Sequence, residues 1–290
     1  MLIAAAAFGC AGCASLLLDT DKPVGGGSPL RAAEGASDGV RFEVYWAHLP
    51  PSVEADDQAE LWRYVQEERL DERLRESLRR HGLRAGVVGG VPPRAITQML
   101  NPTGVDPGPE GSQDAVVATV TGVTRQAITV RPVEAARVTA APVTARVNLF
   151  FPGDGEALEG ETFRQVEPIY RLGVEPHAGG GQTVWLAPEL HHGEARMQWA
   201  ADATGAIARP KPMRDVRSFE DLRIEARLAP GEMIVATSLP GADLLMGGFF
   251  HRADQGADGA RKAIVVRMVR APASTGLVAE AAGRSDRPHF

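Results

Sequence analysis

Apolar and polar residues alternate with a period of two through much of the second half of this 290-residue chain. The longest clear case is residues 143–151, where apolar side chains fall at every second position, and residues 222–228 repeat the pattern. Successive side chains of a β-strand point to opposite faces of a sheet, so this period predicts strands with one buried and one wet face. Such strands are typical of antiparallel sheets.

Other apolar runs between turn residues also predict strands. These runs cover residues 116–123, 127–130, 170–174, 183–187, 194–199, 233–238 and 263–269. The first two are expected to form a hairpin around residues 124–126, and Gly179-Gly180-Gly181 and Pro230-Gly231 are expected turns. Residues 115–271 are therefore predicted to form a β-rich, mainly antiparallel domain.

Residues 40–101 carry a different pattern, which predicts a strand at 40–47, a helix at 53–81, a strand at 83–88 and a helix at 93–100. Gly82 is a natural residue to end the first helix. This β-α-β-α order predicts a small α/β module. Residues 102–114 are rich in Gly and Pro and read as a linker to the β-rich domain. The predicted fold class is α+β.

The N-terminal residues 1–13 are short, apolar and end in Ala11-Gly12-Cys13. This run is far below the ~20 residues that span a bilayer as a helix, and it resembles a bacterial lipoprotein signal. The lipid is expected on Cys13, which two small residues precede, with Cys10 as the alternative. We therefore expect an exported protein that a lipid anchors on the periplasmic side of a membrane. Ala14 in place of Asp favours the outer membrane.

The segments at the two ends of the chain are expected to lack a fixed fold. Residues 14–39 are rich in Gly, Pro, Ala and Ser and read as a flexible linker between lipid and domain. Residues 272–290 have no hydrophobic pattern and are expected to form a disordered tail.

Charge and composition argue against several classes of function. The net charge of −6 is unfavourable for binding nucleic acid, and aromatic residues make up only 6% of the chain. The sequence groups no nucleophile with a base and an orienting residue, so no enzyme activity and no cofactor are predicted.

The run Glu189-Leu-His191-His192-Gly-Glu194 is the only cluster of metal-ligand residue types. His191, His192 and Glu194 are weak candidates for a metal site, because on a strand the two histidines would point to opposite faces. A turn with His191-His192-Gly193 at its tip is the preferred interpretation.

Five short motifs follow one another between residues 143 and 271. They are Arg-Leu-Gly-Val-Glu-Pro (171–176), Gly-Gln-Thr-Val-Trp-Leu-Ala-Pro (181–188), Gly-Glu-Met-Ile-Val (231–235), Leu-Met-Gly-Gly-Phe-Phe (245–250) and Ala-Ile-Val-Val-Arg-Met-Val (263–269). Their order resembles the C-terminal homology region of bacterial secretins, the outer-membrane channel subunits of secretion and pilus systems. The resemblance implies a strand–turn–strand unit and assembly in the envelope. Residues 193–217 lack the alternating apolar pattern of a lipid-facing hairpin, so it implies no pore.

The sequence thus predicts an exported envelope lipoprotein with a structural or assembly role, linked to a protein-export complex. Its expected partners are envelope proteins, including other copies of the chain, and no nucleic acid. One alternative is a periplasmic ligand-binding or structural lipoprotein with no channel role. A second is a metal-dependent hydrolase that would use His191, His192 and Glu194.

Overall fold

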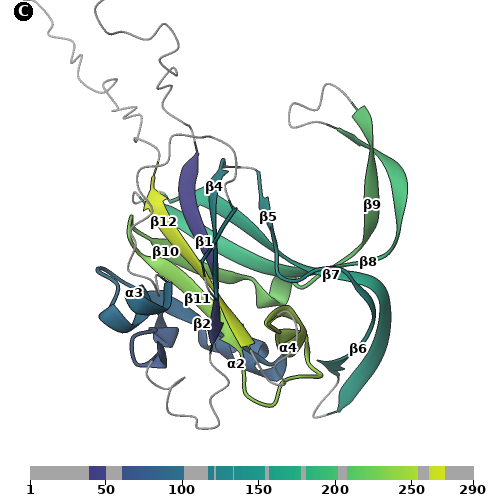
Figure 1. Cartoon of the computed structure of the whole chain (residues 1–290), viewed down its shortest axis with the longest axis horizontal. Helices are drawn as coiled ribbons and strands as arrows, with labels where there is room; N and C mark the ends of the chain where they lie inside the picture. The colour runs from purple at the N-terminus through teal and green to yellow at the C-terminus, as the bar shows by residue number, and fades with distance from the viewer. Residues whose placement is uncertain are drawn as a thin grey trace, which may run out of the picture. The chain divides into compact units, whose positions relative to one another are not determined.

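The alternating segments form two antiparallel sheets in the computed structural model of the chain (Figure 1). The structure describes residues 39–49, 61–100, 117–120, 122–132, 134–153, 157–177, 181–201, 208–253 and 261–271. The first sheet contains β1 (Val40–Leu49), β2 (Leu83–Val88), β3 (Val117–Val120), β4 (Val123–Val130), β11 (Met233–Ser238) and β12 (Arg261–Arg270). The second contains β5 (Ala136–Thr139), β6 (Thr144–Pro152), β7 (Leu158–Pro176), β8 (Gln182–Ala201), β9 (Ala208–Ser218) and β10 (Ile224–Leu228).

The strand order of the first sheet is β2-β11-β12-β1-β4-β3, and that of the second is β10-β8-β7-β5, with β6 paired to β7 and β9 paired to β8. The two sheets pack face to face over one hydrophobic core, to which Phe42 and Ile264 contribute from the first sheet and Leu172 and Leu186 from the second. The prediction of a β-rich, mainly antiparallel fold is confirmed.

The helices are short and lie around the sheets. Those whose bounds lie within the described residues are the 3₁₀ turns η1 (Glu67–Arg69) and η2 (Glu220–Leu222) and the α-helices α2 (Glu72–Arg80), α3 (Arg94–Leu100) and α4 (Met246–Phe250). Trp62 and Val65, just before η1, and Ile96 of α3 pack with Tyr45 and Val265 of the first sheet in a second hydrophobic cluster. This cluster covers the face of the first sheet that points away from the main core.

The strands of the predicted α/β module join a larger sheet. Strands β1 and β2 appear in the predicted order with α2 and α3, but β11 and β12 lie between them in the first sheet. Strand β1 pairs with β12 and β4, and β2 pairs with β11. All described residues belong to one compact unit, residues 36–290. A separate β-α-β-α module is therefore not confirmed.

The helix predicted at 53–81 is wrong in its length. Within the described part of that segment, Gln66 exchanges two main-chain hydrogen bonds with Val87 of β2, which helical backbone could not do. The helix α2 begins only at Glu72, because the Asp71 carboxylate accepts hydrogen bonds from the N–H groups of Arg73 and Leu74 at 2.9 and 3.3 Å. It ends at Arg80 with His81 as its C-cap, and the φ of 76° at the following Gly82 confirms the predicted stop.

Two predicted turns are also corrected. The hairpin turn expected at residues 124–126 lies at Gly122, and those three residues belong to β4. The turn expected at His191-His192-Gly193 does not form, because β8 runs through it and pairs with β9 on both sides. Gly193 has a φ of 78° and lies where the β8–β9 register shifts, so this glycine bends a strand instead of ending it.

A polar network crosses the main core. His251, which follows α4, is fully buried, and its Nδ1 lies 3.0 Å from the carbonyl oxygen of Lys262. That oxygen only accepts, so Nδ1 carries the hydrogen and Nε2 accepts from the hydroxyl of Tyr170 at 2.8 Å. Trp46 packs against both rings. Burial lowers the pKa of His251 to about 3, so the imidazole stays neutral.

Candidate functional site

The three metal-ligand candidates all lie on β8 and are not brought together. Consecutive residues of a strand point to opposite faces, so His191 and His192 point apart. His191 bonds to Glu189, and the ring of His192 packs edge-on against Phe163 with centroids 5.2 Å apart. Glu194 is exposed. Among the described residues no group of three His, Cys, Asp or Glu side chains could hold a metal ion.

Glu189 is nevertheless the centre of a buried polar cluster on the second sheet. Its carboxylate accepts hydrogen bonds from His191 of the same strand at 2.8 Å, from Ser218 of β9 at 3.1 Å and from Arg171 of β7 at 3.4 Å. Arg137 of β5 donates to Nδ1 of His191 at 3.2 Å. The cluster therefore ties four strands together.

The direction of these hydrogen bonds excludes one kind of chemistry at this cluster. An arginine only donates, so Nδ1 of His191 must accept and Nε2 must carry the hydrogen that Glu189 receives. Ser218 donates to Glu189 and not to the imidazole. A serine nucleophile needs a base within hydrogen-bond reach, and here neither imidazole nitrogen is directed at the hydroxyl. We assign the cluster a structural role.

Trp185 of β8 covers a glycine on the neighbouring strand of the same sheet. A Cβ at Gly173 of β7 would collide with the indole, so the absence of a side chain there allows the ring to lie across β7. The guanidinium carbons of Arg223 and Arg171 lie 4.4 and 5.6 Å from the centroid of the ring. Arg223 also pairs with Glu175 at 2.6 Å. The indole is thus already surrounded by partners from within the chain.

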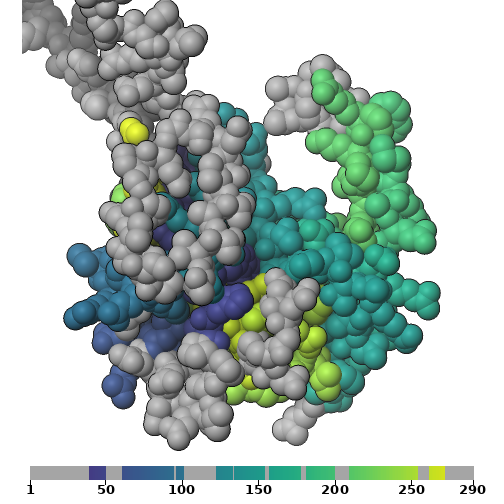
Figure 2. Space-filling view, viewed as in Figure 1, coloured from purple at the N-terminus to yellow at the C-terminus, as the bar shows by residue number. Residues whose placement is uncertain are grey.

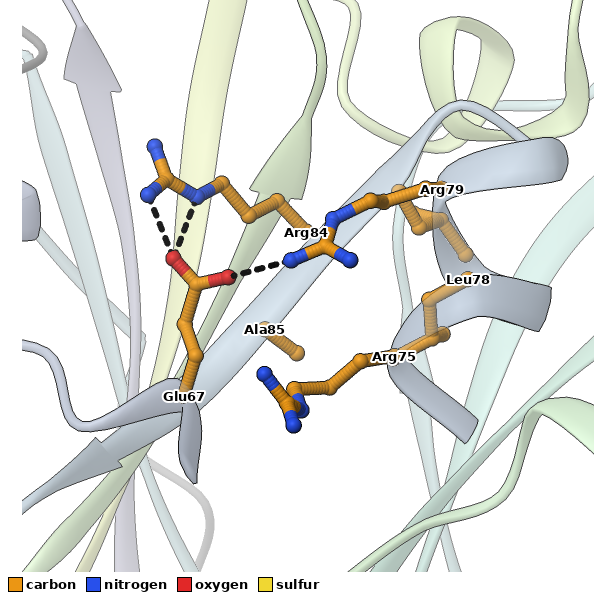
Figure 3. Close-up of a pocket in the computed structure, with 7 residues that line it drawn as sticks. Glu67, Arg75, Leu78, Arg79, Arg84 and Ala85 are labelled. Carbon is orange, nitrogen blue, oxygen red and sulfur yellow. Dashed lines mark hydrogen bonds and ion pairs between the residues drawn. The ribbon is translucent and has the colours of Figure 1, made fainter. Parts of the chain in front are cut away.

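A second cluster of charge lies between α2 and β2, where three arginines surround one carboxylate (Figure 3). Glu67 accepts from Nε of Arg84 at 2.6 Å and pairs with Arg79 at 3.5 Å. Arg75 points into the same cluster, and its Nε has no hydrogen-bond partner. The excess of positive charge could attract an anion, but the cluster has no room for even a water molecule, with a cavity volume near 0 Å³.

A larger pocket lies at the ends of β10 and β12. Its volume is about 360 Å³, within the usual range for small-molecule sites, and Leu228, Pro230 and Met268 are among its lining residues. On its rim, Arg69 donates to Glu232 at 2.9 Å and to the carbonyl oxygen of Arg227. Burial raises the pKa of Glu232, but the hydrogen bonds from Arg69 and from the Ala229 N–H outweigh burial, so the pKa is lowered. These rim charges compensate each other, which favours an apolar ligand.

The most distinctive feature of the second sheet is that it divides. Strands β7 and β8 pair from the turn that joins them as far as Glu167 and His191, and beyond that point each strand pairs with a different partner. The far part of β7 pairs with β6, and the far part of β8 pairs with β9. In Figure 1 the two resulting ribbons curve away from each other. We call the second ribbon, residues 192–201 and 208–217, the β8–β9 arm.

Three residues define the point of division. Gln165 of β7 has a φ of 50°, a left-handed conformation that is uncommon outside glycine, and Gly193 of β8 has a φ of 78°. The guanidinium of Arg214 of β9 donates to the carbonyl oxygens of both, at 2.8 and 2.9 Å. One side chain thus holds the bent backbones of the two diverging strands.

Loss of the Arg214 side chain is expected to loosen the arm without unfolding the sandwich. In an Arg214→Ala variant two charge-assisted hydrogen bonds are lost, worth about 1–2 kcal/mol together at this partly exposed site. Hydrogen exchange should accelerate over residues 194–201 of β8 and stay unchanged over residues 182–190. Lys211→Ala on the same strand is the matched control and should leave both segments unchanged. Uniform acceleration of the whole strand would contradict the assigned role.

The two faces of the arm differ in chemistry. In the ladder Trp199 lies directly opposite Pro210, and Met197 lies opposite Pro212, so these four apolar residues share one face. The alternate positions carry the polar residues Gln198 opposite Lys211, with Arg196 opposite the apolar Met213 and Arg209 opposite Ala200.

The apolar face of the arm is open to solvent. The exposed fraction is 75% for Trp199 and 65% for Met197, although most large apolar residues of the sheets are buried. Figure 2 shows the arm in green, standing out from the rest of the described chain. Exposed clusters of large apolar side chains mark interaction sites, and Trp, Met and Arg are enriched there. The arm is therefore the candidate functional site.

Sequence reasoning found only half of this site. The strand predicted at 194–199 is confirmed as part of β8, but β9 was not predicted, because Pro210 and Pro212 argue against a strand. The signal was present, since residues 209–212 alternate a basic residue with proline. The predicted lipid sites Cys13 and Cys10 lie outside the described residues, as do the signal, most of the N-terminal linker and the C-terminal tail.

Comparisons of the chain with protein-family models, with curated proteins and with solved structures give no match. Among the described residues, no helix has the length and apolar character needed to cross a membrane.

Proposed function

We propose that this chain is a non-enzymatic assembly protein of the cell envelope that contacts another envelope component through the β8–β9 arm. The observation that carries this proposal is the exposed apolar face formed by Met197 and Trp199 with two prolines. Exposing two large apolar side chains is unfavourable by about 1.5–3 kcal/mol each relative to burying them. A partner that covers the face recovers this free energy.

The envelope setting of the proposal rests on the sequence. The N-terminal residues 1–13 resemble a lipoprotein signal that ends at Cys13, which would place the arm near a membrane on the periplasmic side. The link to a protein-export complex rests on the secretin-like motifs at 171–176 and 181–188. The first motif lies on β7 and the second on β8, and residues of the two motifs pair with each other in the ladder. The resemblance implies a strand–turn–strand unit of this kind.

The double variant Met197→Ser/Trp199→Ser tests the proposal. Both side chains are exposed, so we expect a melting temperature within about 2 °C of the original protein. Sedimentation of the purified, unlipidated full-length chain with isolated envelopes should drop at least tenfold.

Val91→Ser/Leu244→Ser is the matched control, since it also removes two exposed apolar side chains and lies outside the arm. This control should sediment like the original protein. Equal sedimentation of the original and the arm variant would contradict the proposal.

The pocket of about 360 Å³ supports a second candidate function, binding of a small apolar ligand. A bound ligand stabilises the native state, so a ligand present at 100 times its Kd should raise the free energy of unfolding by about 2.7 kcal/mol. Thermal shifts across a panel of small apolar metabolites measure this effect. A panel without any shift would rule out this candidate and leave the arm as the functional surface.

A further inference from the structure

We propose that the β8–β9 arm binds the surface of an anionic phospholipid membrane, with Met197 and Trp199 in the head-group region and the basic residues of the arm beside the lipid phosphates. The inference rests on the proposed function and names the component that the arm contacts. The contact is separate from the lipid expected at Cys13.

The apolar face has the composition of a membrane-interface contact. Trp199 combines a large apolar ring with an indole N–H, and such rings concentrate at the level of lipid head groups. Trp199 and Met197 are two residues apart on one strand and point in the same direction, with Pro210 and Pro212 beside them. The arm therefore presents one continuous apolar strip.

The basic residues of the arm supply the charge complementarity. Residues 193–217 hold five basic residues and three acidic ones, a net charge of +2 in a chain whose total is −6. The five basic residues are Arg196, Arg209, Lys211, Arg214 and Arg217. Arg196, Arg209 and Lys211 lie in the outer arm, which we define as residues 196–201 and 208–213. None of these three forms an ion pair with a described residue. A negatively charged surface would attract this part of the molecule and repel the rest.

The arm is narrow enough for both faces to serve one surface. Two paired strands are about 4.8 Å apart, so the long side chains of Arg209 and Lys211 can reach around the edge of the ribbon to the level of the head groups. The outer arm has six residue pairs, from Arg196 and Met213 to Ala201 and Ala208. This is shorter than the 9–11 residues per strand that cross a bilayer. The outer arm is therefore too short to span a membrane, and the proposal places it on the membrane surface.

Two observations disfavour a protein in this place. Six residue pairs at about 3.4 Å per residue give a face of roughly 200 Å², far below the ~800 Å² per partner of a stable protein interface. The prolines at 210 and 212 also remove main-chain donors from the free edge of β9, so this edge is a poor template for an added strand. A second copy would in addition bring together two arms of like charge.

Vesicle binding of the purified, unlipidated full-length chain tests the inference. We expect binding to vesicles of phosphatidylcholine with phosphatidylglycerol, at least tenfold weaker binding to phosphatidylcholine alone, and a blue shift of tryptophan fluorescence that disappears in Trp199→Phe. The triple variant Arg196→Gln/Arg209→Gln/Lys211→Gln should bind about 100-fold more weakly, since each basic side chain near an anionic surface contributes about a fivefold change.

The matched control is Arg131→Gln/Arg146→Gln/Arg164→Gln, which removes three exposed arginines outside the arm. It therefore has the same total charge as the triple variant of the arm. It should bind within about fivefold of the original protein. Equal loss in both triple variants, equal binding to both vesicle types, or binding that survives every arm variant would overturn the inference. If the protein does not bind vesicles but still sediments with isolated envelopes, the partner is a protein and the proposed function stands. If neither binds, both fail.

Discussion

Replacement of Gly247 by alanine is expected to lower the free energy of unfolding by about 3 kcal/mol or more. Gly247 lies in α4, whose five residues are all buried, and its N–H donates to the carbonyl oxygen of His81 at 2.9 Å. A Cβ on Gly247 would lie well within 3.0 Å of the Gly82 backbone, where real Cβ atoms essentially never lie. Neither backbone can move away, because Gly82 also bonds to Leu239.

Chemical denaturation of the Gly247→Ala variant measures this effect as a lower midpoint with an unchanged slope. Gly89→Ala is the matched control, because a Cβ at Gly89 would meet only the ends of the flexible Glu232, Arg69 and Gln66 side chains. We expect this control to lie within about 0.5–1 kcal/mol of the original protein. If the two variants lost the same stability, the close packing of α4 on Gly82 would be wrong.

Acidification from pH 7.5 to pH 5 is expected to destabilise the protein by about 2 kcal/mol through His251 alone. The pKa of this buried imidazole is about 3 in the folded protein, against about 6.5 in the unfolded chain. Below pH 6.5 the unfolded chain takes up a proton that the folded protein does not. The contribution is therefore fully present above pH 6.5 and is lost progressively as the pH falls towards 3.

Urea denaturation across this pH range, compared between the original protein and His251→Gln, isolates the effect, because glutamine does not titrate. The variant should lose about 2 kcal/mol less over the same interval. Glu43 does not interfere in this pH range. Burial raises the pKa of Glu43, but its hydrogen bonds with Tyr45 and Arg125 outweigh burial and lower the pKa, so this carboxylate takes up protons only at more acidic pH. Identical pH dependence in both proteins would mean that His251 is accessible to protons in the native state.

The sequence predicted the elements whose pattern is local. Strands β2 and β11 have the predicted bounds, and α3 differs from the prediction by a single residue at its start. The two strands are short apolar runs between turn residues, buried at all six positions of β11 and at five of the six of β2, and α3 carries its apolar residues at helical spacing before Asn101-Pro102. The mainly antiparallel character followed from the alternation at residues 143–151 and 222–228, since a strand with one wet face is typical of such sheets.

Features that depend on distant contacts could not be predicted in this way. Residues 61–70 have the apolar spacing of a helix, but the main chain of Gln66 pairs with β2, and the sequence does not encode that pairing locally. The two predicted strands at 183–187 and 194–199 are one strand, because Gly193 bends the chain within a ladder that β9 continues. The placement of β1 and β2 within one sheet likewise depends on β11 and β12, which lie far along the chain.

The candidate site likewise depends on contacts between distant residues, which the local sequence pattern does not show. Residue types drew attention to His191, His192 and Glu194, yet the alternation of a strand separates the two histidines, and the His191 ring serves a structural cluster around Glu189. Trp199 and Met197 carry no motif. They become a candidate site only because β9 supplies a second strand that holds both side chains on an exposed face.

The most direct measurement of the central claim is a photocrosslinking scan of the arm in cells that produce the full-length chain. A photoreactive residue would replace Arg196, Met197, Gln198 and Trp199 one at a time. We predict a period of two, with strong crosslinks to an envelope component from positions 197 and 199 and weak ones from 196 and 198. Absent crosslinks, or crosslinks of equal strength from all four positions, would contradict an interaction through the apolar face of the arm.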